Sequence, residues 1–271
     1  MVTLSPEHTI LKEGLADLRG DPAIHPRASI VIPVNAQKDL ENILRLASEI
    51  SRYEGVNTLE LILVVNNFPP DHPPTELKIY RKIGFSVIAI PQIEHKGEVA
   101  IAARIPGIKM AKSEFILLFD ADCKIPNPSA LIDWYVSQLE KGADLAYTHV
   151  DYMDLPTGFS VKVRMFIHHT SRWFRRSVLG IPTTRGSNYG IKRKLMLDLF
   201  SQGRLHYDIL VGPMVRSKGG RIAYSDSKDL IVYTSGRFFS GSWKELFSYL
   251  IWRVGYYLRV GILKSKDTSL L

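Results

Sequence analysis

The chain has 271 residues, of which 45% are hydrophobic and 23% are charged, and its formal net charge is +8. These proportions are typical of a globular protein with a sizeable core, and the length fits one large α/β domain or one domain with an appendage. The positive charge favours an anionic partner such as a nucleotide phosphate, a nucleic acid or an acidic lipid. The single cysteine excludes an intrachain disulfide and fits a reducing compartment such as the cytoplasm.

Residues 1–27 are polar and interrupted by proline, and are interpreted as an N-terminal leader. This segment has no basic stretch followed by an apolar one, so a secretory signal is not expected. No run of about 18 uncharged apolar residues occurs, so a transmembrane helix is not expected either.

From residue 28 onward, short apolar runs alternate with longer amphipathic ones. Seven strands are predicted, at residues 29–34, 59–65, 85–90, 115–119, 144–150, 221–225 and 230–235. Helices are predicted at residues 39–53, 75–83, 98–111, 128–141, 159–179, 192–201, 208–218 and 243–261. This alternation predicts an α/β domain over residues 28–240, with a mostly parallel, Rossmann-type sheet and helices on both faces. Residues 241–271 are predicted to form a C-terminal amphipathic helix and a basic, aromatic tail.

The stretch FILLFDAD at residues 115–122 places two acids directly after a buried strand near the middle of the predicted sheet order. Asp120 and Asp122 are two residues apart, so in an extended segment their side chains point the same way. Mg²⁺ and Mn²⁺ bind to one or two carboxylates together with substrate phosphates. We therefore predict a divalent metal holding a diphosphate; the alternative is that the acids only begin a turn.

Amide side chains follow the first two predicted strands. Pro33 cannot donate a ladder hydrogen bond, so it is placed at the end of the first strand, before Asn35 and Gln37. Asn66 and Asn67 follow the second strand. Asparagine offers both a donor and an acceptor, as recognition of a nucleobase edge requires. For either pair alone, ordinary turn chemistry is the simpler explanation.

Two further segments carry cations. Arg104 lies in the predicted helix before the acidic strand, where it is either a fixed cation for phosphate or a solvated helix residue. Residues 183–194 are rich in Gly, Ser and Asn and are interpreted as a mobile loop that shapes a pocket. Its basic residues, Arg185 and residues 192–194, are candidate phosphate or acceptor contacts, the alternative being an ordinary solvated loop.

Asp208 falls at the start of a predicted helix. An acid there is favoured by the helix dipole, so a capping role is one interpretation. The other is a general base that removes a proton from an acceptor hydroxyl.

The order of these motifs resembles that of the family 2 glycosyltransferases, nucleotide-sugar enzymes of the GT-A fold. The resemblance spans roughly residues 28–235. The matching stretches are VIPVNAQ (31–37), VVNN (64–67), AARIPG (102–107), FDAD (119–122), RGSN (185–188) and YD (207–208).

The resemblance implies a metal-dependent inverting glycosyltransferase that moves a sugar from a nucleoside-diphosphate sugar to a hydroxyl acceptor, such as a lipid-linked or cell-envelope glycan. Mn²⁺ or Mg²⁺ would be coordinated by Asp122, with Asp120 contacting the metal or the donor, and Asp208 would be the catalytic base. The remaining donor-site residues implied are Pro33, Asn35, Gln37, Asn66, Arg104 and Asn188.

Several positions depart from the family pattern. The acid of the first strand end is Gln37 here, and the usual Asp of the second is Asn66. Tyr207 replaces the acid before the base position, and residues 233–235 lack the His that many relatives use as a further metal ligand. The signature of processive synthases is absent, so transfer of a single sugar is expected.

Residues 161–181 and 242–264 mix aromatic, aliphatic and basic side chains. Such segments can lie in a membrane interface, which would place the protein peripherally on the cytoplasmic face; alternatively, their apolar stripes pack on the core and their bases are solvated. Two other functions remain open, a nucleotidyltransferase and a catalytically degenerate binding protein of the same fold. Nucleic acid is not expected as a partner, because no recognised binding motif is present.

Overall fold

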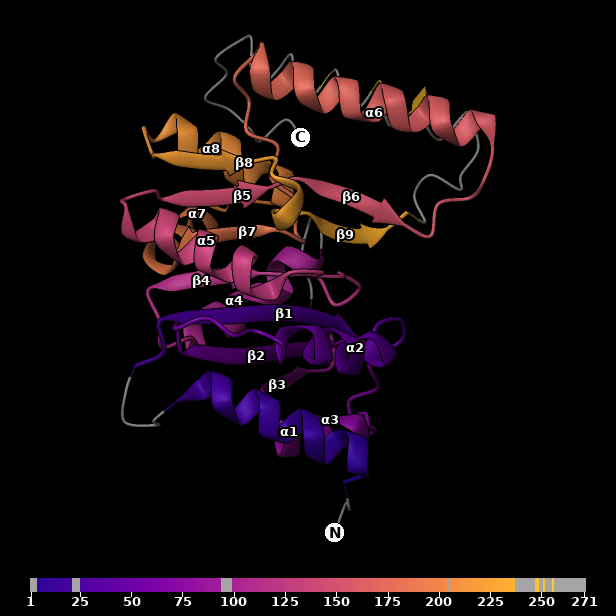
Figure 1. Ribbon diagram of the computed structural model, residues 1–271, viewed down its shortest axis with the longest axis vertical. Coiled ribbons are helices and arrows are strands. Elements are labelled where there is room, and N and C mark those ends of the chain that lie inside the picture. Colours follow the sequence, from indigo (N-terminus) through magenta and orange to yellow (C-terminus); the bar gives the residue numbers. More distant parts are fainter. Residues whose placement is uncertain are drawn as a thin grey trace.

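The computed structural model describes residues 4–20, 25–93, 99–203 and 205–236, together with the isolated positions 247, 248, 251 and 255. Its main sheet has seven strands, in the spatial order β3 (Ser86–Ile90), β2 (Leu59–Asn66), β1 (Ala28–Asn35), β4 (Phe115–Leu118), β7 (Tyr189–Lys192), β5 (Leu145–Thr148) and β8 (Ile222–Ser225) (Figure 1). Every neighbouring pair is parallel except the two that involve β7, which is antiparallel to both β4 and β5. The predicted mostly parallel sheet is therefore confirmed.

The first four predicted strands are confirmed, and β4 lies in the middle of the sheet, as expected. Alternate residues of β1 enter two separate cores: Ile30 and Ile32 belong to one, and Val31 belongs to the other. A strand covered on both faces has no solvent side, which is why these strands are continuous apolar runs rather than alternating ones.

Helices cover both faces of the sheet, as predicted. The core that contains Ile30 is covered by α1 (Pro6–Arg19), α2 (Leu40–Ile50), α3 (Glu76–Ile83) and α5 (Pro128–Glu140). The core that contains Val31 is covered by α4 (Val99–Met110), α7 (Arg193–Ser201) and α8 (Val211–Ser217). A further helix, α6 (Phe159–Ser177), lies across the end of the molecule beyond β8 (Figure 1).

Helix α1 lies within the segment interpreted as a leader. The Ser5 side chain accepts a hydrogen bond from the backbone N–H of His8, and Pro6 occupies the first helical turn, so the helix has a well-formed start. Its apolar stripe, Leu11, Leu15 and Leu18, is buried in the main core. Residues 6–19 therefore pack on the domain because their apolar residues recur at helical spacing.

Two predicted elements differ from the structure. Residues 189–192, expected to lie in a mobile loop, form β7 inside the sheet, where a Cβ on Gly190 would lie only 3.0 Å from Leu117 Cδ2. The predicted strand 144–150 divides into β5 and β6 (Val150–Met153), and β6 pairs with β9 (Val232–Ser235) in a separate two-stranded sheet. Both errors concern four-residue strands, which are too short to show a reliable hydrophobic period.

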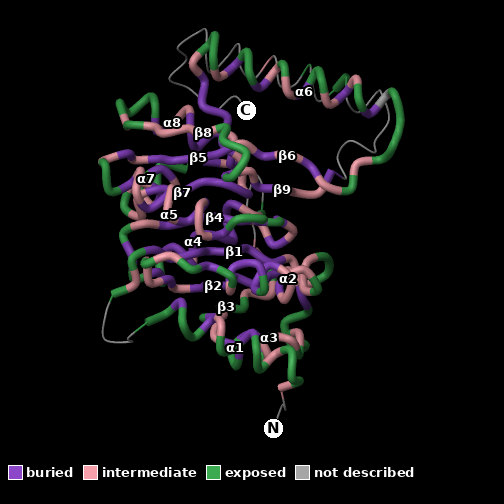
Figure 2. The backbone as a smooth tube through the Cα atoms, in the orientation of Figure 1, coloured by how far each residue is buried: buried purple, intermediate pink, exposed green. Residues whose placement is uncertain are grey.

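Helix α6 has an unusual distribution of side chains. Its buried positions follow helical spacing and are mostly basic; they are Val161, Arg164, His168, Arg172 and Arg175. Its exposed side chains include Phe159, Phe166, Trp173 and Phe174. Figure 2 shows buried and exposed positions alternating along this helix. The interpretation that the apolar stripe packs on the core while the bases are solvated is therefore wrong for α6.

The C-terminal amphipathic helix predicted at residues 243–261 falls outside the described residues, apart from isolated positions. Within the described ranges, no helix is both long enough and apolar enough to cross a membrane.

Candidate active site

The predicted polar groups of the first, second and fourth strands meet at one edge of the sheet. Strands β1, β2 and β4 are parallel, and Asn35 and Asn66 end β1 and β2 in matching register. Asp120 follows the end of β4 by two residues. The carboxyl edge of a parallel sheet is where α/β proteins bind ligands, so this edge is the candidate active site.

Asn35 is at the centre of a small amide cluster. Its Oδ1 accepts hydrogen bonds from the Gln37 backbone N–H and from the Asn67 side chain, both at 3.0 Å. Asn67 has a φ of +64°, a left-handed conformation that asparagine tolerates better than most residues. Asn66 is only 4% exposed, whereas Gln37 is exposed, so of these two predicted donor contacts only Gln37 reaches the surface.

Pro33 lies inside β1 rather than at its end, contrary to the sequence-based expectation. The pairing of β1 with β4 stops at Val31 and Leu118, and Val31 O accepts from the Phe119 N–H. The backbone nitrogen of residue 33 points toward β4, as the backbone polar groups of residue 31 do. The ladder between β1 and β4 has already ended there, so residue 33 has no partner on β4. The missing N–H of proline therefore removes no ladder hydrogen bond.

Arg104 joins the two predicted acidic motifs. Its side chain is completely buried and forms ion pairs with both Asp120 and Asp208. It also donates a hydrogen bond to the Gly186 carbonyl oxygen at 3.0 Å. Its complete burial excludes the solvated helix residue considered for this position, while a contact with phosphate stays a prediction.

The surroundings of this arginine favour its charged form. Burial alone lowers the pKa of Arg104, but the carboxylates of Asp208 and Asp120 outweigh burial and raise its pKa above the ordinary value. Tyr189 OH donates to the second Asp208 oxygen at 2.9 Å. Burial, reinforced by Asp208, raises the pKa of Tyr189, so this phenol remains a donor.

Gly186 allows this cluster to close. A Cβ at this position would lie 2.5 Å from an Arg104 Nη, 2.8 Å from Asp208 Oδ2 and 3.1 Å from Asp120 Oδ1. These distances are too short for any other residue without movement of the ion pairs. The glycine of the RGSN stretch is therefore required by close packing against three charged side chains.

Asp122 lies partly exposed beside the buried cluster. Thr234 of β9 donates a hydrogen bond to its Oδ1 at 3.3 Å, and a bridge between Lys124 and Tyr233 holds the two segments together. Among the residues that the structure describes, no group of three His, Cys, Asp or Glu side chains could hold a metal ion. The donors here are oxygen atoms, which suit a hard divalent cation whose remaining ligands come from a substrate diphosphate.

Asn188, predicted to lie near the donor sugar or acceptor, is 1% exposed. Its side-chain amide donates to the Thr148 carbonyl, and its own carbonyl accepts from Tyr135 OH at 2.7 Å. Asn188 therefore links the loop before β7 to β5 and α5 through hydrogen bonds.

Two groups at this site are not predicted from the sequence. The sequence pattern places Tyr189 in a loop, and it indicates for Thr234 only that a His ligand is lacking there. No local pattern identifies either one, because each acts through a partner far away in the chain. For Thr234 the partner, Asp122, is 112 residues away.

A mostly parallel sheet with an acidic site at its carboxyl edge fits the GT-A-like class of α/β proteins. Sequence comparison identifies the family within that class. The family model for glycosyl transferase family 2 matches residues 29–200, more than half of the chain, so the chain belongs to that family. No curated protein sequence matches the chain.

Solved structures share the fold at low identity. A mannosyltransferase from Pyrobaculum calidifontis, in complex with GDP-Man and Mn²⁺, is 12% identical with a TM-score of 0.57, covering 96% of this chain and 72% of that one. Glucosyl-3-phosphoglycerate synthase from Mycobacterium tuberculosis, in complex with phosphoglyceric acid, is 15% identical with a TM-score of 0.55, covering 91% and 84%. S. aureus TarS, in complex with UDP-GlcNAc, is 16% identical with a TM-score of 0.51, covering 80% and 61%.

Proposed function

We propose that this chain is an inverting glycosyltransferase that moves one sugar from a nucleoside-diphosphate sugar to a hydroxyl acceptor with the help of Mn²⁺ or Mg²⁺. One observation carries the proposal: Arg104 unites Asp120 and Asp208 beside Asp122, at the ligand-binding edge of a family 2 domain. The complexes of structural neighbours with GDP-Man and UDP-GlcNAc support a donor of this class.

Asp122 is the principal residue that would hold the metal, because its carboxylate is partly exposed while Asp120 is paired with Arg104. A bound divalent cation supplies positive charge that stabilises a departing nucleoside diphosphate. The amide cluster around Asn35 and the exposed Gln37 lies at the adjacent strand ends, where the nucleoside would bind.

Asp208 would accept the proton of the acceptor hydroxyl as that oxygen attacks the anomeric carbon from the face opposite the leaving group. In the structure, one of its oxygens pairs with Arg104 and the other accepts from Tyr189. These contacts fix the orientation of the carboxylate, and a general base must be held within hydrogen-bond reach of the proton that it removes. The fixed position of Asp208 beside Asp120 keeps the base and the donor site together.

Thermal-shift screening of UDP-, GDP- and dTDP-sugars, with and without Mn²⁺, tests the donor proposal. One donor class should raise the melting temperature only when Mn²⁺ is present, and Asp122→Ala should abolish this rise. The exposed Asp17 of α1 provides the matched control, since Asp17→Ala removes the same charge near the start of β2, at the opposite edge of the sheet, and should leave the rise intact. If no donor stabilises the wild type with either metal, the proposal fails.

The proposed base is tested separately by Asp208→Asn. This variant should lose transfer of the sugar while keeping the Mn²⁺-dependent stabilisation by donor, since an amide cannot accept the acceptor's proton. Turnover at the wild-type rate would remove Asp208 from this role.

The exposed aromatic face of α6 supports peripheral contact with a membrane, which suits a lipid-linked acceptor. Phe159 and Phe166 are 83% and 72% exposed, and aromatic side chains of this kind insert into the lipid headgroup region.

Phe166→Ser should weaken co-sedimentation with anionic vesicles. Val56→Ser is the control, because Val56 is 97% exposed on another part of the surface. Equal sedimentation of all three proteins would refute membrane contact through α6.

A further inference from the structure

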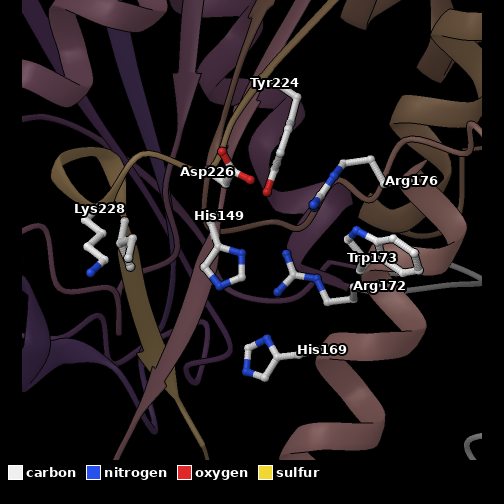
Figure 3. Close-up of a pocket in the computed structure, with 9 residues that line it drawn as sticks. His149, His169, Arg172, Trp173, Arg176, Tyr224, Asp226 and Lys228 are labelled. Carbon is white, nitrogen blue, oxygen red and sulfur yellow. The ribbon is translucent and has the colours of Figure 1, made fainter.

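A cavity lies between α6 and the end of β8, outside the acidic cluster. Its volume is about 340 Å³, within the range of roughly 300–1,000 Å³ found for small-ligand sites. The residues that line it are His149, His169, Arg172, Trp173, Arg176, Tyr224, Asp226, Lys228 and Ile231 (Figure 3). Most of its polar groups are therefore hydrogen-bond donors.

Arg172 is the most informative of these residues. Its side chain is 2% exposed, and one Nη donates to the Val150 carbonyl at 2.8 Å. Its Nε and its other Nη are buried and have no acceptor among the described residues, and no described carboxylate forms an ion pair with it. A buried guanidinium without an anion is costly, so these two donors favour an anion that can accept their hydrogen bonds.

The groups around Arg172 increase this requirement. Burial, followed by the repulsion of Arg185, lowers its pKa to about 10, so the guanidinium stays charged near neutral pH. Burial and the same Arg172 charge lower the pKa of His149 to about 4. His149 is therefore neutral at pH 7, although a nearby anion would favour its charged form.

The pocket as a whole matches a doubly charged anion. Its formal cations are Arg172, Arg176 and Lys228, and its only carboxylate is Asp226, which leaves two positive charges on the described lining. Arg172 and Arg176 both project from α6 into the cavity, toward His149 and Tyr224 (Figure 3). The Tyr224 hydroxyl is buried and has no described hydrogen-bond partner, so it adds a further donor.

One loop connects this pocket to the proposed catalytic centre. Arg185 lies 2.9 Å from His168 on the inner face of α6, and the next residue, Gly186, accepts the hydrogen bond from Arg104. The loop at residues 185–186 therefore contacts both α6, which lines the pocket, and Arg104 of the proposed catalytic centre.

We propose that this pocket binds a phosphate monoester group of the acceptor substrate, held by Arg172 and Arg176 and oriented by His149 and Tyr224. The inference rests on the proposed function, because it makes the cavity the acceptor subsite. A phosphate dianion matches the two surplus charges, and guanidinium groups bind its oxygens in a bidentate manner. The phosphate belongs either to a soluble molecule or to a lipid headgroup, and the chemistry recognised is the same.

Titration with inorganic phosphate tests whether the pocket binds a soluble phosphate. The buffer is metal-free and contains EDTA, so phosphate cannot bind through a metal ion at the proposed donor site. Saturable binding by calorimetry, together with a rise in the His149 pKa measured by NMR, is the expected result. Arg172→Gln and Arg176→Gln should each weaken binding about tenfold or more, as expected for loss of a charge-assisted hydrogen bond. Arg176 is only half-buried, so its variant remains informative if Arg172→Gln does not fold.

Arg52→Gln is the matched control, since it removes one positive charge at an exposed position away from the pocket. Equal weakening by the control, or full binding by Arg176→Gln, would overturn the proposal. The lipid arm compares vesicles of phosphatidic acid with vesicles of phosphatidylcholine. A preference for phosphatidic acid that Arg176→Gln abolishes assigns the phosphate to a lipid. Absence of both phosphate binding and that preference refutes the site.

The donor experiment separates this proposal from the one on which it rests. The pocket variants should keep the Mn²⁺-dependent stabilisation by nucleotide-sugar, because Arg172 and Arg176 line the cavity beside α6, whereas Asp120 and Asp122 follow β4. Phosphate binding without any donor response would leave the pocket in place and remove the glycosyltransferase proposal. A donor response with neither phosphate binding nor a preference for phosphatidic acid would keep the glycosyltransferase proposal and remove the pocket.

Discussion

Two helices of this molecule bury arginines, and they do so in opposite ways. Arg104 of α4 is fully buried between two carboxylates of its own chain, Asp120 and Asp208. Arg172 of α6 is almost as deeply buried, but its nearest charged neighbours include other arginines. The first arginine is compensated within the fold, whereas the second has donors for an anion that comes from outside. The comparison distinguishes a structural cation from a binding cation.

The largest expected effect on stability concerns Arg104, the arginine that two carboxylates compensate. Arg104→Met would leave Asp120 and Asp208 without their common partner in a largely buried site. Breaking a buried ion pair in this way costs about 3–5 kcal/mol, so the free energy of unfolding should fall by that amount and transfer activity should be lost. Urea denaturation measures the loss. A change below about 1 kcal/mol would show that the pairs contribute little to folding.

Gly186→Ala should disturb the same cluster less severely. The added Cβ would meet an Arg104 Nη at 2.5 Å, and overpacking of this kind costs about 1–3 kcal/mol. Gly158→Ala is the control, because a Cβ at Gly158 meets nothing within 4 Å. Thermal unfolding of both variants under identical conditions makes the comparison. Equal melting temperatures would mean that the cluster can relax around a methyl group.

Arg172→Met should behave in the opposite way to Arg104→Met. It removes an uncompensated buried cation and only one described hydrogen bond, so in phosphate-free buffer stability should change by less than about 1 kcal/mol or should rise. Added inorganic phosphate should stabilise the wild type but not this variant. A loss as large as that of Arg104→Met would place Arg172 among the structural cations.

A further expected effect concerns pH. The folded-state pKa of His149 is lowered to about 4 from an ordinary value of 6.5, mainly by burial and then by Arg172. The unfolded chain therefore binds more protons between these two values, and stability should fall as the pH drops from 6.5 toward 4. His149→Gln should reduce this loss, measured by urea denaturation at pH 7 and pH 5.

Other groups also titrate in this range, so the pH dependence of the free energy of unfolding should be weaker in His149→Gln than in the wild type, but should not vanish. The pKa of His169 is lowered as well, again chiefly by burial. If the free energy of unfolding falls equally with pH in the wild type and in His149→Gln, folding does not lower the pKa of His149.

The N-terminal half of the sheet could be predicted from sequence with accurate boundaries. Strands β1 to β4 are apolar runs separated by helical segments, and each predicted strand range differs from the observed one by one residue at most at either end. The C-terminal half was less predictable. Strands β5, β6 and β7 each have four residues, and their pairing depends on segments far away in the chain.

The site divides in the same way. The positions of Asp120, Asp122 and Asn35 at strand ends follow from local pattern, because a parallel sheet brings those ends to one edge. The contact between Arg104 and Asp208 spans 104 residues, and no local signal reports it. The role of Gly186 was likewise hidden, since it depends on three side chains from other elements.

By itself, the sequence determined the class of fold, the acidic edge and the resemblance to family 2, because hydrophobic period and motif order are properties of contiguous residues. Tertiary structure alone decided which arginine is compensated, which face of α6 is buried and where the pocket beside α6 lies. These properties depend on which side chains meet after folding, and the free energy of a buried charge is set by its neighbours in space rather than by its neighbours in sequence.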